Sequence, residues 1–197
     1  MTQRRTPDSA RRSLRSRDAI LAATRELIAE LGYAKLTIEA IAARAGVGKQ
    51  TIYRWWPSKG AVVFDSLLAL SEDEQGIELP DTGDLEADLK LVLRATAEEF
   101  SDPAFEAPIR ALNIELIGDP ELTAQYREKM EAPVRAAKLR RLRSAQDAGQ
   151  LPADTDLDLL LDMLYSPFTQ RWLTRSGPLT TDYVDSLVER TLRAFRP

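Results

Sequence analysis

The chain has 197 residues, of which 44% are hydrophobic and 29% are charged, and it contains neither cysteine nor histidine. Disulfides, thiolate zinc sites and thiol nucleophiles are therefore excluded, and acid–base chemistry lacks its usual imidazole. We expect no metal, no cofactor and no enzyme activity. No apolar run approaches the roughly 20 residues that span a bilayer, and the basic start lacks the apolar core of a secretory signal. We expect a cytoplasmic protein that contacts no membrane.

The net charge of −4 conceals an uneven distribution along the chain. Residues 1–60 carry 12 Lys and Arg against 5 Asp and Glu, whereas residues 61–197 carry 15 against 26. Neutralisation of phosphates supplies most of the non-specific affinity of a protein for DNA, so a basic first part suits a nucleic-acid contact at that end. A solvated basic tail explains the same charges, and the distribution alone leaves both interpretations open.

The spacing of apolar residues predicts helices throughout, because no run alternates apolar and polar residues for long enough to indicate a strand. The first helix is expected over residues 17–31, with Ser16 as its cap, and residues 1–16 are expected to form a disordered basic arm. The later helices are expected over residues 37–45, 49–55, 58–70, 84–101, 103–117, 119–148, 156–175 and 181–195. Their candidate caps are Asp119, Asp156 and Thr181.

The segment LTIEAIAARAGVGKQTIYRWWPSK, residues 36–59, has the spacing of a helix-turn-helix. Ala42 is small enough for two helices to approach closely, and Gly46 tolerates the left-handed conformation that a short turn needs. A shared core is expected from Ile38, Ile41, Val47 and Ile52. The outer face of the second helix is polar and suits base edges and phosphates: Lys49, Gln50, Thr51 and Arg54. An αα-corner within an ordinary helical protein is the alternative.

At these residues the chain resembles the TetR (tetracycline-repressor) family of bacterial regulators. The similarity lies in Gly46-Val47, Thr51-Ile52-Tyr53 and Lys59, and upstream in Ile20-Leu21-Ala22-Ala23, Gly32-Tyr33 and Leu36-Thr37-Ile38. It is specific over residues 17–70 and weaker beyond them. Three positions depart from the usual pattern: Trp56 for Phe, Gly60 for an acidic residue, and Val62 for Leu.

The resemblance implies an all-α fold of about nine helices, with a three-helix DNA-binding domain over residues 17–60. Residues 61–197 would form a regulatory and dimerisation domain. It also implies a ligand-responsive homodimer, of which the usual kind is a repressor, that binds a palindromic double-stranded DNA operator. The implied DNA contacts are Thr37, Gly48, Lys49, Gln50, Thr51, Tyr53, Trp55 and Lys59. Trp56 is expected to pack under the fourth helix instead.

The segment from Leu157 to Leu173 is apolar on more than one face, and such a helix must be covered on more than one face. We therefore expect a subunit interface in the last two helices, with Leu161, Leu164, Trp172, Tyr183, Leu187 and Arg190. The effector is expected to be an apolar or aromatic small molecule. Its candidate contacts, each of which has a core role as the ordinary alternative, are Phe100, Phe105, Asn113, Leu116, Tyr126, Met130, Met163, Tyr165 and Phe168.

Two other classes of function are the alternatives to a ligand-responsive regulator. A helical enzyme would need paired carboxylates, but Glu98 and Glu99 are adjacent on a helix and point about 100° apart, and Glu106 has no nucleophile beside it. The remaining alternative is a helical interaction protein, or an activator, whose helix-turn-helix is not controlled by a small ligand. The sequence identifies neither the operator nor the effector.

Overall fold

The computed structural model describes residues 7–71 and 78–195, and within these ranges it contains helices and no strand. The predicted all-α fold is confirmed. The expected helix over residues 119–148 is observed as three consecutive segments: α7 (Pro120–Tyr126), a π-helical turn (Arg127–Glu131) and α8 (Ala132–Asp147). When these segments are taken as one helix, the described ranges hold the predicted nine helices and one 3₁₀ turn. None of these helices is long and apolar enough to cross a membrane.

The chain folds into two compact units. The first unit takes residues up to 74 together with 103–126, and the second takes residues 75–102 and 127–197. This division does not coincide with the predicted boundary at residue 60. The apolar faces of α4 (Lys59–Ser71) and α6 (Pro103–Gly118) explain the difference, because both helices lie almost entirely after that boundary and pack against α1 (Pro7–Leu31). The assignment of DNA binding to residues 17–60 and of regulation and dimerisation to residues 61–197 stays a prediction.

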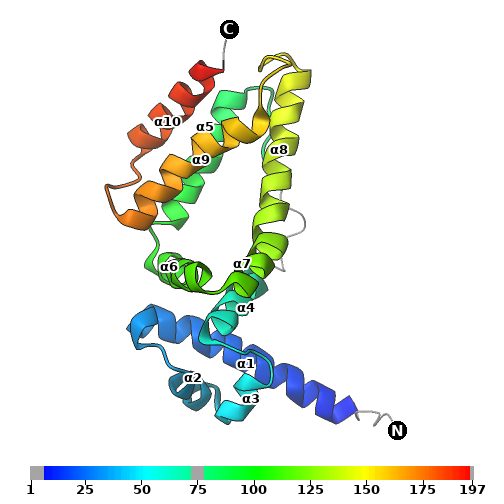
Figure 1. Ribbon diagram of the computed structural model, residues 1–197, viewed down its shortest axis with the longest axis vertical. Helices are drawn as coiled ribbons and strands as arrows, with labels where there is room; N and C mark the ends of the chain where they lie inside the picture. The colour runs from blue at the N-terminus through cyan, green and yellow to red at the C-terminus, as the bar shows by residue number, and fades with distance from the viewer. Residues whose placement is uncertain (1–6, 72–77, 196–197) are drawn as a thin grey trace. The chain divides into compact units, whose positions relative to one another are not determined.

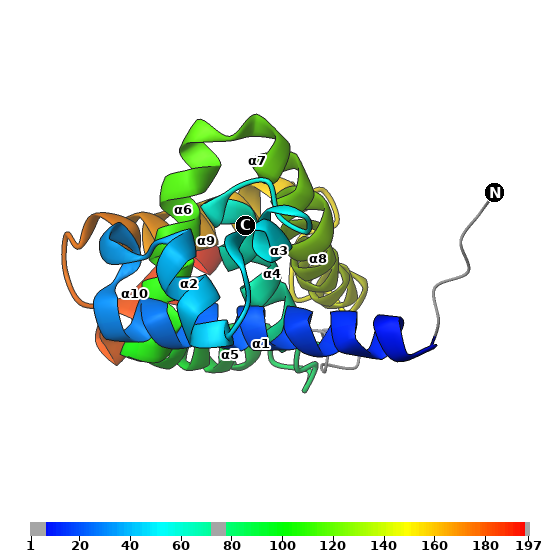
Figure 2. The same cartoon turned by 90° about the horizontal axis from the view of Figure 1, so that it is seen from below.

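The first unit contains α1 (Pro7–Leu31), the 3₁₀ turn η1 (Tyr33–Lys35), α2 (Ile38–Ala45), α3 (Lys49–Tyr53), α4 (Lys59–Ser71), α6 (Pro103–Gly118) and α7. The long helix α1 packs against α2, α4 and α6 (Figure 1). Figure 2 views this unit from the side of α2 and α3, with α1 running beside them. Its buried core draws on all of the larger helices and includes Ile20, Ile28, Ile41, Val63, Phe64 and Leu112.

Helix α1 begins at Pro7 and not at Arg17, so the expected cap at Ser16 and the expected disordered arm are wrong over residues 7–16. Residues 1–6 of that arm lie outside the described ranges. The physical reason is local. Proline suits the first turn of a helix, and the Ala, Arg and Leu residues that follow it have high helix propensity.

The second unit contains α5 (Leu85–Glu99), α8, α9 (Leu157–Thr174) and α10 (Thr181–Ala194). Helix α5 packs against α10, and α9 packs against α8 and α10. Two predicted side-chain caps are confirmed. In the first unit Asp119 accepts a hydrogen bond from the N–H of Leu122, and in the second unit Asp156 accepts one from the N–H of Leu159. At α10 the cap is Thr180 and not Thr181, because the Thr180 hydroxyl accepts the N–H of Tyr183. The core of this unit includes Leu89, Leu93, Leu142, Leu160, Leu164, Phe168, Val184 and Val188.

Candidate DNA-binding surface

The turn between α2 and α3 has the geometry that the sequence predicts. Thr37 caps α2, since its hydroxyl accepts a hydrogen bond from the amide of Ala40 at 3.1 Å. At the other end, Gly46 adopts the left-handed conformation, with φ of 67°, and the amide of Val47 bonds to the carbonyl of Ala42 at 2.9 Å. A glycine in this conformation closes the helix without the steric cost that other residues bear.

The predicted shared core of the two helices is also present. Ile38, Ile41, Ala42 and Ile52 are buried, and Val47 is half-buried. Ile52 faces inward, whereas Lys49, Gln50 and Tyr53 of the short helix α3 are exposed. This packing fixes the orientation of α3 within the first unit.

The implied DNA contacts therefore lie mostly on an exposed surface. Thr37, Gly48, Lys49, Gln50, Tyr53 and Trp55 are exposed, and Thr51 is half-buried. Arg54, which closes α3, is exposed beside them with its guanidinium 6.0 Å from the centre of the Trp55 ring. It belongs to the predicted polar face but is absent from the DNA contacts that the family resemblance implies. The positive charge of Arg54, directly after Tyr53 in the chain, is the sequence feature that could have placed it among the predicted DNA contacts.

Lys49 forms an ion pair on this surface in the protein without DNA. Its ammonium lies 2.9 Å from Oε1 of Glu39, and both side chains are exposed. The hydrogen bond raises the pKa of Lys49 and lowers the pKa of Glu39. Both groups therefore stay charged, and the predicted DNA contact of Lys49 would require it to exchange this carboxylate for a phosphate or a base.

Lys59 differs from the other implied contacts because its ammonium faces the protein. It lies 3.7 Å from the centre of the Tyr33 ring and donates to the carbonyls of Tyr33 and Leu36, each at 3.3 Å. Lys59 thus ties the start of α4 to the turn before α2. Its contact with DNA stays a prediction.

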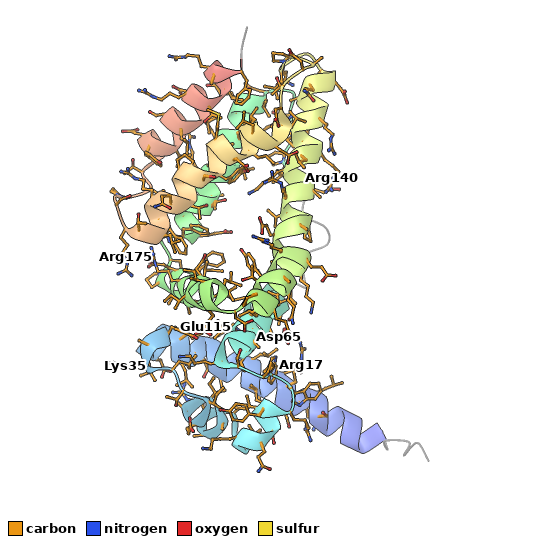
Figure 3. All side chains as sticks on the ribbon, viewed as in Figure 1. Arg17, Lys35, Asp65, Glu115, Arg140 and Arg175 are labelled. Atoms are coloured by element: carbon orange, nitrogen blue, oxygen red, sulfur yellow. The ribbon has the colours of Figure 1, made fainter. Side chains whose placement is uncertain are left out.

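Trp56 is buried, as expected, and it packs against α4. Its indole N–H donates to Oδ2 of Asp65 at 2.9 Å, and the same carboxylate oxygen lies 3.5 Å from the guanidinium of Arg17 on α1 (Figure 3). Through Asp65, Trp56 forms a structural link between α1 and α4.

The predicted effector contacts are divided between the two units. Phe105, Asn113, Leu116 and Tyr126 belong to the first unit, where the Asn113 amide donates to the carbonyl of Ile109 at 2.9 Å. In the same unit, Tyr126 meets the ring of Phe64 edge-on at 6.3 Å. The remaining candidates belong to the second unit: Phe100, Met130, Met163, Tyr165 and Phe168.

Within the second unit, two of these candidates are parts of an aromatic cluster. The rings of Phe100 and Phe168 lie 5.8 Å apart, and the ring of Trp172 lies 4.5 Å from that of Phe100. Phe168 is buried, whereas Met163 is 40% exposed, because the five residues that separate them turn the helix by about 140°. The structure therefore does not bring Met163 and Phe168 together.

Three of the predicted interface residues are core residues instead. Leu161, Leu164 and Trp172 are buried in a single copy of the chain, and the indole N–H of Trp172 donates to the carbonyl of Phe100 at 3.2 Å. Neighbouring helices of the same unit cover this face of α9, so the prediction was wrong for these three. Tyr183 and Leu187 are half-buried and Arg190 is exposed, and their role stays a prediction.

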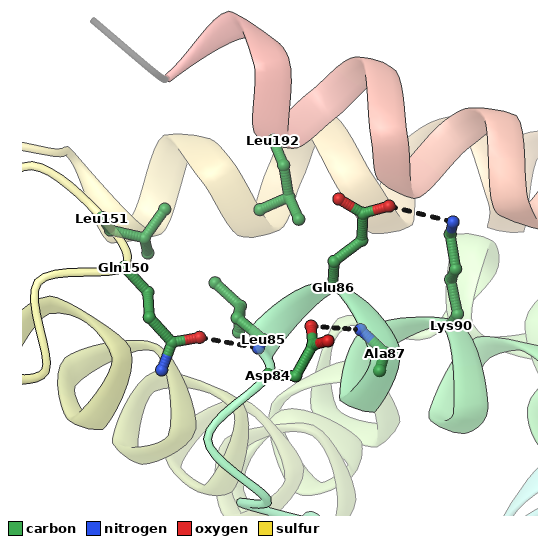
Figure 4. A pocket seen from close by; sticks show the side chains of 8 residues that line it. All are labelled: Asp84, Leu85, Glu86, Ala87, Lys90, Gln150, Leu151 and Leu192. Carbon is green, nitrogen blue, oxygen red and sulfur yellow. Dashed lines mark hydrogen bonds and ion pairs between the residues drawn. The ribbon is translucent and has the colours of Figure 1, made fainter.

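Figure 4 shows a pocket of about 590 Å³ in the second unit. None of the predicted effector contacts lines it. Its polar groups are engaged with one another: Lys90 lies 3.0 Å from Glu86, and the Gln150 amide oxygen accepts the N–H of Leu85 at 2.7 Å. Polar groups that already have partners gain little from a ligand, so this pocket is a weak candidate for an effector site.

The similarity to known protein families covers both parts of the chain. The family described as "Bacterial regulatory proteins, tetR family" matches residues 20–65, and "Tetracyclin repressor-like, C-terminal domain" matches residues 79–191. The chain belongs to the TetR family. It is a helix-turn-helix transcriptional regulator of that family, whose members are regulators and not enzymes.

Named relatives of this TetR-family regulator cover nearly its whole length. The uncharacterized HTH-type transcriptional regulator YdeS of Bacillus subtilis (strain 168) is 33% identical, over 90% of this chain and 87% of its own. The "DNA-binding transcriptional repressor TetR" of Mycobacteroides abscessus is 30% identical, over 88% and 90%. The crystal structure of the TetR-family transcription regulator SCO0332 is 36% identical and superposes with a TM-score of 0.68, covering 92% of this chain and 99% of that one.

Proposed function

We propose that this TetR-family regulator binds a palindromic operator as a homodimer, represses transcription there, and is released by a small molecule. The observation that carries the proposal is the surface of α3. Buried Ile52 anchors this helix, while Lys49, Gln50 and Tyr53 extend outward with donors and acceptors for bases and phosphates. Repression is supported by the relative from Mycobacteroides abscessus, which is named a repressor.

Homodimerisation is supported by an exposed stripe on α9. Leu159, Met163 and Leu173 are between 37% and 50% exposed, and exposed Ser166 and Gln170 continue the spacing of three and four residues. Such spacing places all five side chains along one side of the helix. Three of these five side chains are apolar, and an exposed face of this kind suits a second copy of the same chain, with Tyr183, Leu187 and Arg190 of α10 as further proposed contacts.

The dimer face is tested by placing a charge on it. We expect Met163→Glu to convert the dimer into a monomer in sedimentation at micromolar concentration, because the carboxylate would have to be desolvated in the interface. Leu91→Glu is the matched control, since Leu91 is 59% exposed on α5. A Met163→Glu variant that remains dimeric would contradict the proposed face.

The central experiment is the selection of bound sequences from random duplex DNA by the full chain. We expect two inverted half-sites about 34 Å apart, bound with an affinity that falls steeply with salt.

Lys49→Ala and Tyr53→Ala should each weaken binding of the selected site, whereas Lys129→Ala, at an exposed position of the π-helical turn, should not. Equal binding of every duplex would refute the proposal. A reporter with the selected site then separates repression from activation.

A further inference from the structure

Two polar side chains of the second unit face each other across α8 and α9. The ammonium of Lys138 lies 3.3 Å from the centre of the Tyr165 ring. The hydroxyl oxygen of Tyr165 is shielded from solvent and has no hydrogen-bond partner in the described part of the chain. A shielded hydroxyl without a partner is costly, so this oxygen is a place where a ligand can gain a hydrogen bond.

The two arginines next to Lys138 on α8 both have carboxylate partners. Arg135, one turn earlier on α8, lies 2.6 Å from Asp158 and 3.2 Å from Asp162. Arg141, one turn later, lies 2.7 Å from Asp88. No carboxylate within the described ranges forms an ion pair with Lys138. This ammonium therefore lacks the direct anionic partner that both neighbouring arginines have.

Burial lowers the pKa of Lys138 to about 8; the charge of Arg135 acts in the same direction and that of Glu131 in the opposite one. A group with this pKa still carries its proton at neutral pH. The neighbour in direct contact is the face of the tyrosine ring, which compensates a cation only weakly. A full negative charge in contact would compensate it better.

One ligand group can satisfy both side chains. The hydroxyl belongs to the ring over which the ammonium lies, so a carboxylate next to Lys138 is also near that hydroxyl. Tyr165 packs with Phe100 and Leu139 against the apolar core of the unit, so the surroundings of this charge favour an apolar ligand body. The arrangement combines one cation, one hydroxyl donor and apolar surroundings.

We propose that the effector is a small organic acid with an apolar body, whose carboxylate pairs with Lys138 and accepts a hydrogen bond from Tyr165. This rests on the proposed function, because it names the class of molecule that would release the regulator from DNA. It also narrows the apolar or aromatic effector expected from the sequence to one that carries a negative charge.

The test compares acids with their uncharged amides on the full chain without DNA. The probes are benzoate and benzamide, cinnamate and cinnamamide, and octanoate and octanamide, measured by thermal melting and calorimetry. At least one acid should raise the melting temperature and bind at least tenfold more tightly than its amide.

Lys138→Met should weaken binding of that acid at least tenfold and Tyr165→Phe about threefold to tenfold. Lys129→Met, which removes an exposed lysine, should leave it unchanged.

Three results would overturn the proposal: no acid binds, an amide binds as tightly as its acid, or Lys138→Met binds the acid like the wild type. Melting of the unliganded Lys138→Met variant shows that it is folded, and removal of a desolvated charge should not lower its melting temperature. Release from the selected operator is measured separately. If operator DNA is bound but the acid is not, this inference fails alone; if the acid is bound but no operator is selected, the proposed function fails alone.

Discussion

The side chain of Glu115 on α6 fills the space into which a side chain at position 60 would point. A Cβ atom at Gly60 would lie 2.9 Å from Oε2 of Glu115 and 3.0 Å from its Cβ and Cγ. Glu115 also accepts the hydroxyl hydrogen bond of Tyr33, over whose ring Lys59 lies. Burial and this hydrogen bond raise the pKa of Tyr33, which keeps its proton. The departure from the family pattern at Gly60 thus has a steric reason.

Gly60→Ala tests this relationship. In an exposed helix the change would stabilise by about 0.5–1 kcal/mol, but here the new methyl group meets Glu115, and overpacking costs about 1–3 kcal/mol. We expect a net loss of about 1 kcal/mol in the free energy of unfolding, measured with urea. Gly118→Ala is the control, because nothing lies within 4 Å of its Cβ position. Gly60→Ala combined with Glu115→Ala should lose less than the two single changes together.

Substitutions at Gly46 and Gly48 are expected to affect different properties, the first the stability of the fold and the second the affinity for DNA. Gly46→Ala should destabilise the fold by about 1–2 kcal/mol, because φ is 67° there. Gly48 has φ of −78° and open space around its Cβ position, so Gly48→Ala should leave the unfolding free energy unchanged or slightly higher. If Gly48 lets the backbone approach DNA closely, the same variant should bind the selected operator at least tenfold more weakly. Unchanged operator binding would remove Gly48 from the contact set.

Glu39→Gln should strengthen operator binding. The change removes a carboxylate that holds Lys49 in the free protein and that would repel phosphates. We expect about a threefold to tenfold gain in affinity at 50 mM salt, measured by fluorescence anisotropy, which shrinks as salt screens the charge. Glu189→Gln removes a similar partner, 2.6 Å from Lys90 in the second unit, and should have no effect. A loss of affinity in Glu39→Gln would show that Glu39 itself contacts the operator.

The buried ion pair of Asp88 and Arg141 should govern the acid stability of the second unit. Burial acts to raise the pKa of Asp88, but the hydrogen bonds from Arg141 and Thr82 outweigh it, and the net pKa is lowered. A lowered pKa stabilises the folded state above the unfolded value of about 3.9, and this contribution is lost as the pH falls through the folded value. We expect the unfolding free energy of the wild type to drop more steeply below pH 4 than that of Asp88→Asn.

At pH 7, Asp88→Asn should lower the unfolding free energy by about 3–5 kcal/mol, because it leaves the Arg141 charge buried and unpaired. Asp81→Asn is the control. Its carboxylate lies 3.5 Å from the same guanidinium but is 45% exposed, so its removal should cost at most about 1 kcal/mol. Equal losses in both variants, measured by chemical denaturation, would show that burial of the pair does not matter.

The helix-turn-helix was predictable because its determinants are local. Gly46 is required by a backbone conformation, Ala42 by the close approach of two helices, and Ile52 by the helical period, and all three lie close together in the chain. The exposed set around Lys49 follows from the same period. The caps Asp119 and Asp156 were found for the same reason, since a cap acts on an amide three residues away.

The helical class, the helix-turn-helix and the polar face of α3 could be predicted from the sequence alone, because these depend on residues near one another in the chain. The other features depend on tertiary packing. It buried Leu161 and Trp172 in the core and kept Met163 exposed, because the burial of each face of an apolar helix depends on which neighbours cover it. It also placed Glu115 beside Gly60 and Lys138 over Tyr165. Contacts between residues so distant in the chain leave no periodic signal in the sequence.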